Sequence, residues 1–410
     1  MGLFGKKKQK KEVPPIFTFA LSTNTIPPDD TLLDKLQPII DTDPEVIIVI
    51  ASLNFDLVEV VKRFTKIFPK TQIVGVKPRG IIATESAFIP KQGIGLLALS
   101  KDVFRASVWF PTNSKEHKIE YGIPVAIKKF IKYHTKYTTT FKTAFNLLIG
   151  DSYQNGHLLI DTYEKELNSE GIYNIPLIGA ILHPEIPQKQ DFLVFAFKNN
   201  IEIIKNGFIF ISIFTKYNVE NKIASGLYPR IPFKITEAHD SIVLKLNQRP
   251  AFITYKEYIS KKGLSEDTIT KNLPLIFATY QFGFPNPRSP KHPEIRIAIK
   301  RTEEDALKFN GEIAKGSTIW IMEADTNRMI EHTRSLIENN NEKVVGGIIF
   351  SSIFRLIRMK NDYLKDLENI RQIMGNRPFL MFNTYLEIFY KNAKEAYTNS
   401  STNLINIFNR

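Results

Sequence analysis

The sequence predicts an α/β protein in which repeated β-α-β layers form mixed sheets flanked by helices. One observation is that the chain repeats the same order of strand, helix and strand. A second is that its richest apolar runs, such as VIIVIASLNF and GFIFISIF, have the length of strands and carry apolar residues on both faces. Strands of this kind belong in sheets that helices cover. The chain of 410 residues is also long enough for two or three domains.

Two segments show the repeat most clearly. Glu45 opens a continuous apolar strand, which a short loop and an amphipathic helix connect to a strand that enters Gly75. The same order starts again at Phe145 and leads into a strand that enters Gly179. A third, looser copy is predicted between residues 316 and 352. Such internal repeats indicate related layers within one architecture.

The segment between the second and third copies predicts a hairpin followed by a helix. Alternating runs at Ile231–Thr236 and Ser241–Leu246 flank a polar turn, and a second turn leads into an amphipathic helix that begins near Ala251. Gly226 stands just ahead of the first strand, where we expect it to supply a backbone conformation that other residues resist. The Pro-rich stretch 283–296 is interpreted as an excursion between two strands, with a lid as the alternative.

The sequence lacks the residues and motifs of most catalytic and metal-binding sites. It contains no cysteine, which excludes disulfides and thiol nucleophiles and fits a reducing compartment such as the cytoplasm. The seven histidines do not pair at metal-ligand spacing, and we interpret them as surface or turn residues. No G-x-G-x-x-G after a strand, Walker A or G-x-S-x-G motif occurs. We therefore expect no metal and no cofactor. No apolar run approaches the roughly 20 residues of a spanning helix.

The charge of the chain is concentrated at its start. The formal net charge is +13, and five lysines lie in the N-terminal stretch MGLFGKKKQKK. We interpret residues 1–30 as a basic, Pro-containing tail and linker, with a weak contact to a membrane surface as the alternative. The other basic residues are scattered, and neither a basic stripe nor an aromatic–basic signature of RNA binding is present. The charge therefore does not indicate a nucleic-acid partner.

Polar side chains stand where two apolar strands of the C-terminal third end. The run VVGGIIFSSIFR ends at Ser351 and Ser352 and continues to Arg355, and ligands of α/β sheets lie at such carboxyl ends. Glu387 lies in the apolar run PFLMFNTYLEIFY. Because a buried lone carboxylate is costly, Glu387 is exposed, paired or functional. An ion pair with Arg355 is the structural interpretation. The same run carries Asn383, Thr384 and Tyr385.

These patterns resemble the FIST sensory domain family, and the resemblance covers the chain from about residue 30 to about residue 390. The most specific match is the segment GLYPRIPFKITEA, followed by the pattern R-P-A-x-x-x-Y-x-x-Y. TQIVGVKPRGII is similar to the family's P-V-x-G-C-S-T-A-G-E-I. GIIFSSIFR and FNTYLEI look like its F-S-C-x-x-R and F-Y-T-Y-G-E-I, with serine in place of the cysteine. The landmark residues of these matches are Gly75, Gly80, Gly179, Gly226 and Pro229.

The resemblance implies a two-part architecture and a sensory function. It places a FIST-N-like α/β domain at residues 31–249 and a FIST-C-like α/β domain at residues 250–390, and it leaves residues 391–410 as a tail or short helix. It also implies an intracellular, non-enzymatic protein that binds small ligands, either amino acids or other small carboxylates. We expect no fused output domain, and therefore a signalling protein partner.

A site for an amino acid needs a cationic fork for the carboxylate and an anionic partner for the ammonium. Arg355 matches the family's arginine and offers such a fork, and Glu387 matches its acid. Two alternatives stay open: an enzyme on the same scaffold that uses Glu387 with Thr384 or Tyr385, and a degenerate scaffold that only binds a protein partner. The predicted ligand pocket is lined by Arg355, Glu387, Ser351, Ser352, Asn383 and Tyr385.

Overall fold

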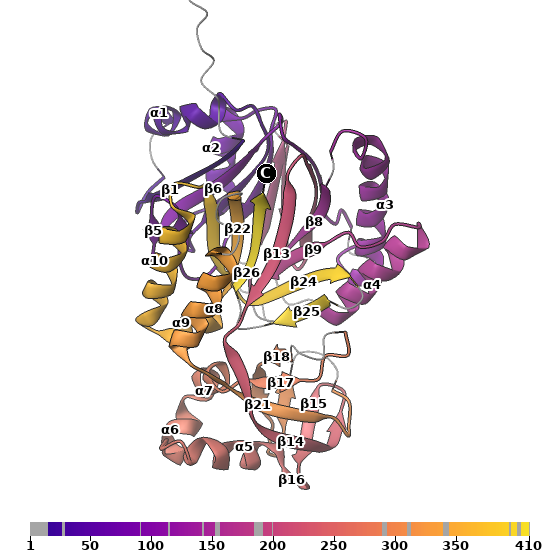
Figure 1. Cartoon of the computed structure of the whole chain (residues 1–410), viewed down its shortest axis with the longest axis vertical. Helices are drawn as coiled ribbons and strands as arrows, with labels where there is room; N and C mark the ends of the chain where they lie inside the picture. Colours follow the sequence, from indigo (N-terminus) through magenta and orange to yellow (C-terminus); the bar gives the residue numbers. More distant parts are fainter. Residues whose placement is uncertain are drawn as a thin grey trace, which may run out of the picture.

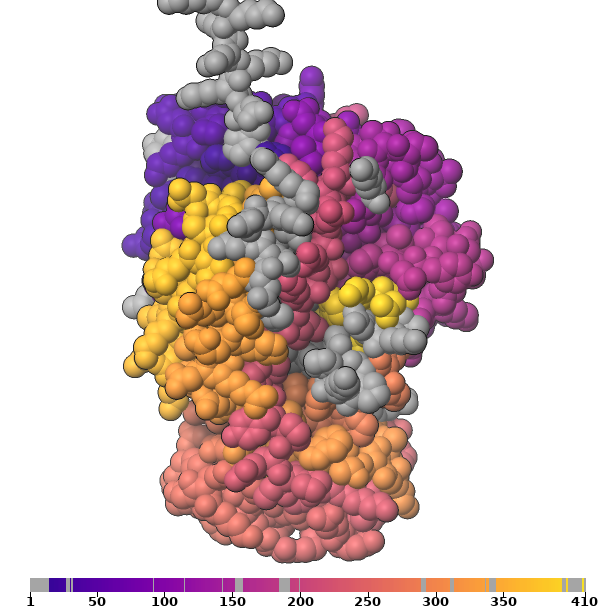
Figure 2. Space-filling view, viewed as in Figure 1, coloured from indigo at the N-terminus to yellow at the C-terminus, as the bar shows by residue number. Residues whose placement is uncertain are grey.

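In the described residues, the computed structural model contains four β-sheets with helices packed against them (Figure 1). Three sheets form a large body, and the fourth forms a small module at one end of the molecule (Figures 1 and 2). The Lys-rich part of the predicted tail lies outside the described residues. The structure describes residues 15–26, 29–90, 92–113, 115–141, 143–151, 156–183, 192–198, 200–288, 293–309, 313–338, 344–392, 395–399 and 403–409.

The first sheet contains the first predicted copy of the repeat. Its central strands, β2 (Pro44–Ala51) and β3 (Gln72–Val76), are parallel and are joined by helix α2 (Leu57–Ile67). Antiparallel strands flank this pair on both sides, and helix α1 spans Asp29–Ile40. The strand order is β1-β6-β2-β3-β10-β11, with β1 at Ile16–Ser22, β6 at Gly93–Ser100, β10 at Leu193–Phe197 and β11 at Asn200–Ile204.

The second sheet contains the second predicted copy and has the same plan. Its parallel pair, β8 (Thr143–Gly150) and β9 (Leu177–Ile181), is joined by helix α4 (Gly156–Ser169). Helix α3 (Ile119–Tyr137) packs beside α4. The strand order is β25-β24-β9-β8-β12-β7, with β7 at Phe104–Trp109, β12 at Phe208–Thr215, β24 at Leu386–Asn392 and β25 at Glu395–Asn399.

The third sheet repeats the plan once more. Its parallel pair is β22 (Val344–Ser352) and β23 (Phe379–Thr384), joined by helices α9 (Ile353–Met359) and α10 (Asp362–Met374). The strand order is β13-β26-β22-β23-β4-β5, with β4 at Ile82–Thr84, β5 at Phe88–Ile89, β13 at Asn218–Ala224 and β26 at Asn403–Asn409.

Each sheet of the body takes a hairpin from the next copy of the repeat. Strands β4 and β5 follow β3 in the chain, but β4 pairs with β23 in the third sheet. Strands β10 and β11 follow β9, but β10 pairs with β3 in the first sheet. Strands β24 and β25 follow β23, but β24 pairs with β9 in the second sheet. The exchange is cyclic, so segments from both sides of the predicted boundary at residue 249 share sheets.

Within the described part of the chain, the small module consists of the fourth sheet and three helices. The segment predicted as a hairpin and helix is confirmed, because β14 pairs with β15 and a helix starts at Ala251. The Pro-rich stretch lies between the paired strands β17 and β18. This agrees with its interpretation as an excursion between two strands. The elements are β14 (Leu227–His239), β15 (Ile242–Leu246), β16 (Arg249–Pro250), α5 (Ala251–Ser260), α6 (Glu266–Lys271), α7 (Leu273–Thr279), β17 (Phe282–Phe284), β18 (Glu294–Arg296), β19 (Ala298–Arg301), β20 (Leu307–Phe309) and β21 (Thr318–Ala324).

The third copy of the repeat lies later in the chain than predicted. The prediction joined β21 to β22 through helix α8 (Thr326–Glu338), but β21 pairs antiparallel with β14 and β17 in the small module. The true copy runs from β22 through α9 and α10 to β23. The prediction is wrong because a strand–helix–strand pattern records chain order, whereas the sheet that a strand joins is set by packing.

The prediction of a tail or short helix over residues 391–410 is also wrong. Strand β25 pairs with β24, and β26 lies inside the third sheet, between β13 and β22. The weak apolar stripe of this segment fits either a helix or a strand. The backbone groups of β26 gain partners on both sides as a strand, which decides the conformation.

The three sheets of the body turn their inner faces toward one shared core. In β2, Val46, Ile48 and Ile50 point into this core, while Ile47 and Val49 pack with helices on the outside. Strands β8 and β22 alternate in the same way. The strands are therefore apolar on both faces because one face meets the shared core and the other meets helices. Within the described ranges, no helix is both long enough and apolar enough to cross a membrane.

Gly226 links the body to the small module, and its substitution gives a direct test of this junction. Its φ of +75° is left-handed, as predicted, and an added Cβ would lie 2.5 Å from Met329 Cα. Gly263, at the end of the turn after α5, has a φ of +88° but no heavy atom within 4 Å of an added Cβ. We expect Gly263→Ala to cost about 1–2 kcal/mol of unfolding free energy from backbone strain alone.

Gly226→Ala should cost about 2–4 kcal/mol, because a clash with the backbone of α8 adds to the same strain. Urea unfolding of both variants measures the difference. Equal losses in the two variants would contradict the clash at the junction.

Candidate functional site

The carboxyl ends of the three parallel strand pairs meet at one end of the body. The amide of Ile81, after β3, donates to Oδ1 of Asn383 in β23 at 2.7 Å. The amide of Tyr385, directly after β23, donates to the carbonyl of Ile181 at the end of β9 at 2.7 Å. This end of the body is where ligands of α/β sheets are expected, and the predicted polar residues lie here.

A third contact joins the loops after β3 and β9. Nε of Arg79 lies 3.2 Å from Nδ1 of His183 and donates to it. His183 is fully buried and lies in a bend after β9, so its interpretation as a surface residue is wrong. Its position directly after an apolar strand was the available signal for burial. Gly80, a family landmark with a φ of +105°, lets this loop approach, because an added Cβ would lie 2.5 Å from Oδ1 of Asn383.

Ser351 and Asn383 lie together, as predicted, but they bind each other and Tyr363. They face one another across the parallel pair β22 and β23. Nδ2 of Asn383 donates to the Ser351 carbonyl at 3.1 Å and to the Tyr363 hydroxyl at 2.8 Å. The hydroxyls of Ser351 and Tyr363 are 2.7 Å apart. All three side chains are buried, so this cluster fixes α10 against the sheet.

Arg355 is fully buried and its guanidinium is used inside the protein. Nε donates to Asp366 of α10 at 2.8 Å. Nη2 donates to the carbonyl of Met329 at 2.7 Å and to Oγ1 of Thr333 at 2.9 Å, both in α8. Nη1 donates to the carbonyl of Ser225 at 3.1 Å, just before Gly226. Arg355 therefore ties α8, α9 and α10 to the start of the small module.

The predicted ion pair between Arg355 and Glu387 does not form. Glu387 is the second residue of β24 in the second sheet and is 2% exposed, and it accepts a hydrogen bond from Oγ1 of Thr384 at 2.6 Å. Arg355 instead pairs with Asp366 on the outer side of the third sheet. The structure therefore separates the two residues that the sequence suggested as the two halves of an amino-acid site.

The remaining two predicted residues lie near the junction with the small module. Tyr385 is half-buried, and its ring packs edge-on against Phe354 of α9 with 5.1 Å between centroids. Ser352 is fully buried, and its hydroxyl has no hydrogen-bond partner in the described part of the chain. The shared pocket that the sequence predicts for the six residues remains a prediction.

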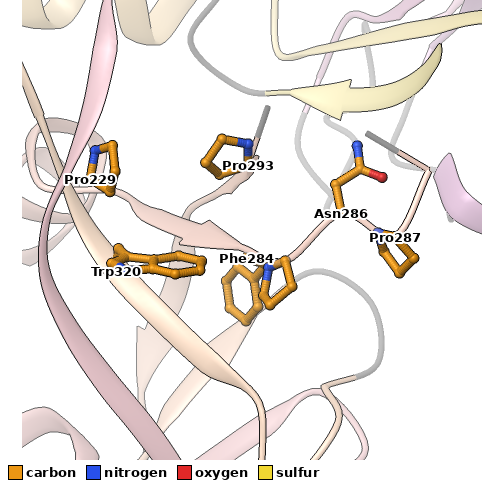
Figure 3. Close-up of a pocket in the computed structure, with 7 residues that line it drawn as sticks. Pro229, Phe284, Asn286, Pro287, Pro293 and Trp320 are labelled. Atoms are coloured by element: carbon orange, nitrogen blue, oxygen red, sulfur yellow. The ribbon is translucent and has the colours of Figure 1, made fainter. Parts of the chain in front are cut away.

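A cavity of about 410 Å³ opens between the Pro-rich stretch and the sheet of the small module (Figure 3). The indole of Trp320 extends from β21 toward Phe284, and Pro229 and Pro293 lie across the cavity from it (Figure 3). Trp320 is on the sheet face opposite Ile319 and Ile321, which are in the core of the module. The described residues that line the cavity are Pro229, Phe284, Pro285, Asn286, Pro287, Pro293 and Trp320.

The wall of the cavity is held against the body. Nδ2 of Asn286 donates to the carbonyl of Ala396 in β25 at 3.0 Å. Arg288, two residues later, forms ion pairs with Asp161 and Glu164 of α4. The cavity therefore lies where a loop of the small module contacts the second sheet and its helix.

The lining of the cavity is apolar and aromatic. None of the described lining residues carries a charge, and the Asn286 amide already binds the body. Aromatic rings and prolines offer flat apolar surfaces on which a planar group stacks. The described residues contain no group of three or more side chains placed to hold a metal ion. Sequence reasoning recognised Pro229 as a landmark but missed the cavity, because Trp320 and the Pro-rich stretch are far apart in sequence.

Comparisons with known proteins agree with the resemblance seen in the sequence. A family model described as FIST N domain matches residues 45–249, and one described as FIST C domain matches residues 251–390. FIST domains are in general sensory domains that bind small ligands. No curated protein matches the chain.

One solved structure found in the comparison is the C-terminal domain of sex pheromone staph-cAM373 precursor from Staphylococcus aureus, with 11% sequence identity and a TM-score of 0.10. The match covers 47% of this chain and 62% of that chain. The chain thus spans less than two thirds of that domain, and we infer nothing about this protein from a match with so low a TM-score.

The structural role of Arg355 predicts a large loss of stability when it is replaced. Arg355→Met leaves Asp366 buried without its cation, so we expect the unfolding free energy to fall by about 3–5 kcal/mol. Arg355→Met combined with Asp366→Leu should recover most of this loss, because no buried charge is then left over. Urea unfolding of both variants provides the measurement.

Arg334→Met is the matched control, because Arg334 pairs with Glu338 on the surface of α8. It should change stability by about 0–1 kcal/mol. An Arg355→Met variant as stable as this control would contradict the structural role.

Proposed function

The chain belongs to the FIST family, and on that premise we propose that it is a sensory protein that binds a small molecule with a planar apolar part in the cavity at Trp320. The observation that supports this proposal is the cavity itself. Its volume of about 410 Å³ falls within the range of small-molecule sites, and such sites are lined mainly by apolar and aromatic groups.

The lining narrows the class of ligand. Amino acids and other small carboxylates are the ligands that the family resemblance implies. The guanidinium of Arg355 is already engaged inside the protein, since it binds Asp366 and α8. Trp320, Phe284 and the prolines fit an aromatic or branched side chain. Amino acids with such side chains are therefore the members of the expected class that we propose.

The position of the cavity gives binding a route to the rest of the protein. The same stretch that lines the cavity binds β25 through Asn286 and α4 through Arg288. A ligand that moves this stretch changes its contacts with the body, and only such differential contacts shift a conformational equilibrium. We propose that a cytoplasmic signalling partner recognises this change.

A second candidate function is an enzyme that uses Glu387. The hydrogen bond from Thr384 to Glu387 at 2.6 Å places a buried hydroxyl and a carboxyl in contact, which is the kind of pair that acid–base catalysis uses. Chemical turnover of a bound ligand would favour the enzyme, and binding without turnover favours the sensor.

The fluorescence of Trp320 offers a direct test of ligand binding. The chain has two tryptophans, and Trp109 is 3% exposed in the core of the body. In a Trp109→Phe background, aromatic and branched amino acids are titrated while indole emission and Tm are recorded. A ligand at the cavity should change the emission and raise Tm. At a ligand concentration of 100 times Kd, the free energy of unfolding should rise by about 2.7 kcal/mol.

Trp320→Leu should raise the Kd of that ligand about tenfold, which is the scale of one lost aromatic contact. Leu275→Ala is the control, because Leu275 is 50% exposed on α7 of the same module. A ligand that raises the Tm of Trp320→Leu as much as that of the parent protein binds elsewhere, and the proposal would then fail.

A further inference from the structure

Helix α3, at the outer edge of the body (Figure 1), turns a line of lysines to solvent. Its buried face packs against the second sheet and carries Ile119, Gly122, Ile123, Ala126, Ile127 and Phe130. Lys128, Lys132 and Lys136 are exposed on the other side. Because these lysines are four positions apart, they lie in one stripe along the helix. The interpretation of the basic residues beyond the tail as scattered is therefore wrong for this helix.

An exposed tyrosine continues the lysine stripe toward the start of α3. Tyr121 precedes Lys128 by seven positions, which is about two turns of the helix, so the two side chains point the same way. The Tyr121 side chain is 45% exposed, and Nζ of Lys115 lies 4.4 Å from the centre of its ring. Tyrosine has an apolar ring and a polar tip, which is why it is common at the interface between membrane and water.

A second basic group adjoins the end of α3 and is joined to the stripe by aromatic rings. Nζ of Lys136 lies 5.0 Å from the ring centre of Tyr137, and that ring packs edge-on against Phe141. Two cations lie over the ring of Phe141, Arg105 at 5.4 Å and Lys216 at 5.9 Å from its centre. The stripe and the second group therefore form one continuous surface.

Basic side chains outnumber acidic ones on this surface, which we call the α3 surface. The basic side chains are Arg105, Lys128, Lys129, Lys132, Lys136 and Lys216. Glu120, in the first turn, is the only acidic residue of α3. Asp102 is exposed, and its carbonyl accepts a hydrogen bond from Nζ of Lys216 at 2.6 Å. These two carboxylates offset only part of the positive charge.

The Lys-rich stretch of the sequence joins the described chain at the same end of the α3 surface. Its five lysines lie within residues 1–11. The described chain starts at Pro15, whose carbonyl accepts a hydrogen bond from the amide of Ser100 at 2.9 Å. The next two residues after Ser100 bind the second basic group, because their carbonyls accept hydrogen bonds from Arg105 and Lys216. The stretch is therefore attached beside a surface of its own charge.

We propose that the α3 surface docks the protein on an anionic lipid membrane. The outer face of a single helix is convex, so it fits an extended partner better than a small ligand. The stripe contains lysines and no arginine. Paired recognition of one phosphate or carboxylate uses arginine, whereas lysines are compact charges that a diffuse negative potential attracts. Groups of about four to eight basic residues on an amphipathic helix are typical of binding to phosphatidylserine.

Sedimentation with lipid vesicles tests the docking. The full chain is mixed with vesicles of phosphatidylcholine, with or without about 30% phosphatidylserine, in about 0.1 M KCl. The protein should sediment only with the vesicles that contain phosphatidylserine, and about 0.5 M KCl should release it, because salt screens exposed charges. Equal sedimentation with both kinds of vesicle, or with neither, would overturn the proposal. Retention on polyglutamate beads without binding to phosphatidylserine would indicate an acidic protein partner, and would also overturn it.

Two triple variants of equal net charge locate the surface. Replacement of the three stripe lysines, by Lys128→Gln, Lys132→Gln and Lys136→Gln, should lower the partition coefficient on phosphatidylserine vesicles about tenfold or more. The matched control replaces exposed lysines of the small module, by Lys261→Gln, Lys300→Gln and Lys315→Gln, and should bind like the parent protein. Equal losses in the two variants would show attraction by net charge alone, and the docking surface would then be refuted.

A chain that starts at residue 15 separates the α3 surface from the Lys-rich stretch. In this background, the stripe variant should still bind phosphatidylserine vesicles more weakly than the control variant, because the stripe itself contacts the lipid. Equal binding of the two variants in this background would assign the binding to the Lys-rich stretch and would contradict the proposal.

Discussion

The body of this protein depends on the burial of strands that are apolar on both faces. A single sheet with helices on one side would leave the other face in water. Here three sheets bury their inner faces against each other in one shared core, and helices cover the outer faces. The cyclic exchange of hairpins ties the sheets together, because each sheet needs strands from another copy of the repeat. The carboxyl ends of all three parallel pairs therefore meet at one end of the body.

The sequence predicted what local patterns determine. The first two repeats, the hairpin of the small module and the left-handed Gly226 are confirmed. The predicted bounds of the third repeat and the predicted tail or short helix at the C-terminus were wrong, because pairing partners distant in the chain decide the conformation of both segments. The candidate site shows the same limit. The match of Arg355 and Glu387 to the family's arginine and acid suggested a ligand site, but the partner of Arg355 is Asp366 on the next helix, which lies in no motif of the sequence.

The small module packs at the end of the body where the strand ends converge. One face of its sheet presents Trp320 to the apolar cavity, whose wall contacts β25 and α4. The other face presents Glu323, which forms an ion pair with Lys262. Arg355 in α9 holds the start of the module in place. A change at the cavity therefore acts on contacts between module and body, as the proposed sensory function requires.

Hydrogen exchange of the full chain, with and without each aromatic amino acid, tests most directly whether the cavity at Trp320 is the ligand site. Binding there should slow exchange in β17, in β21 and in β25, because the ligand contacts the first two and the cavity wall binds the third. Protection of these three segments together, with the core strands β2 and β8 unchanged, is the predicted result. Protection confined to other segments, or no protection by any of these amino acids, would contradict the account.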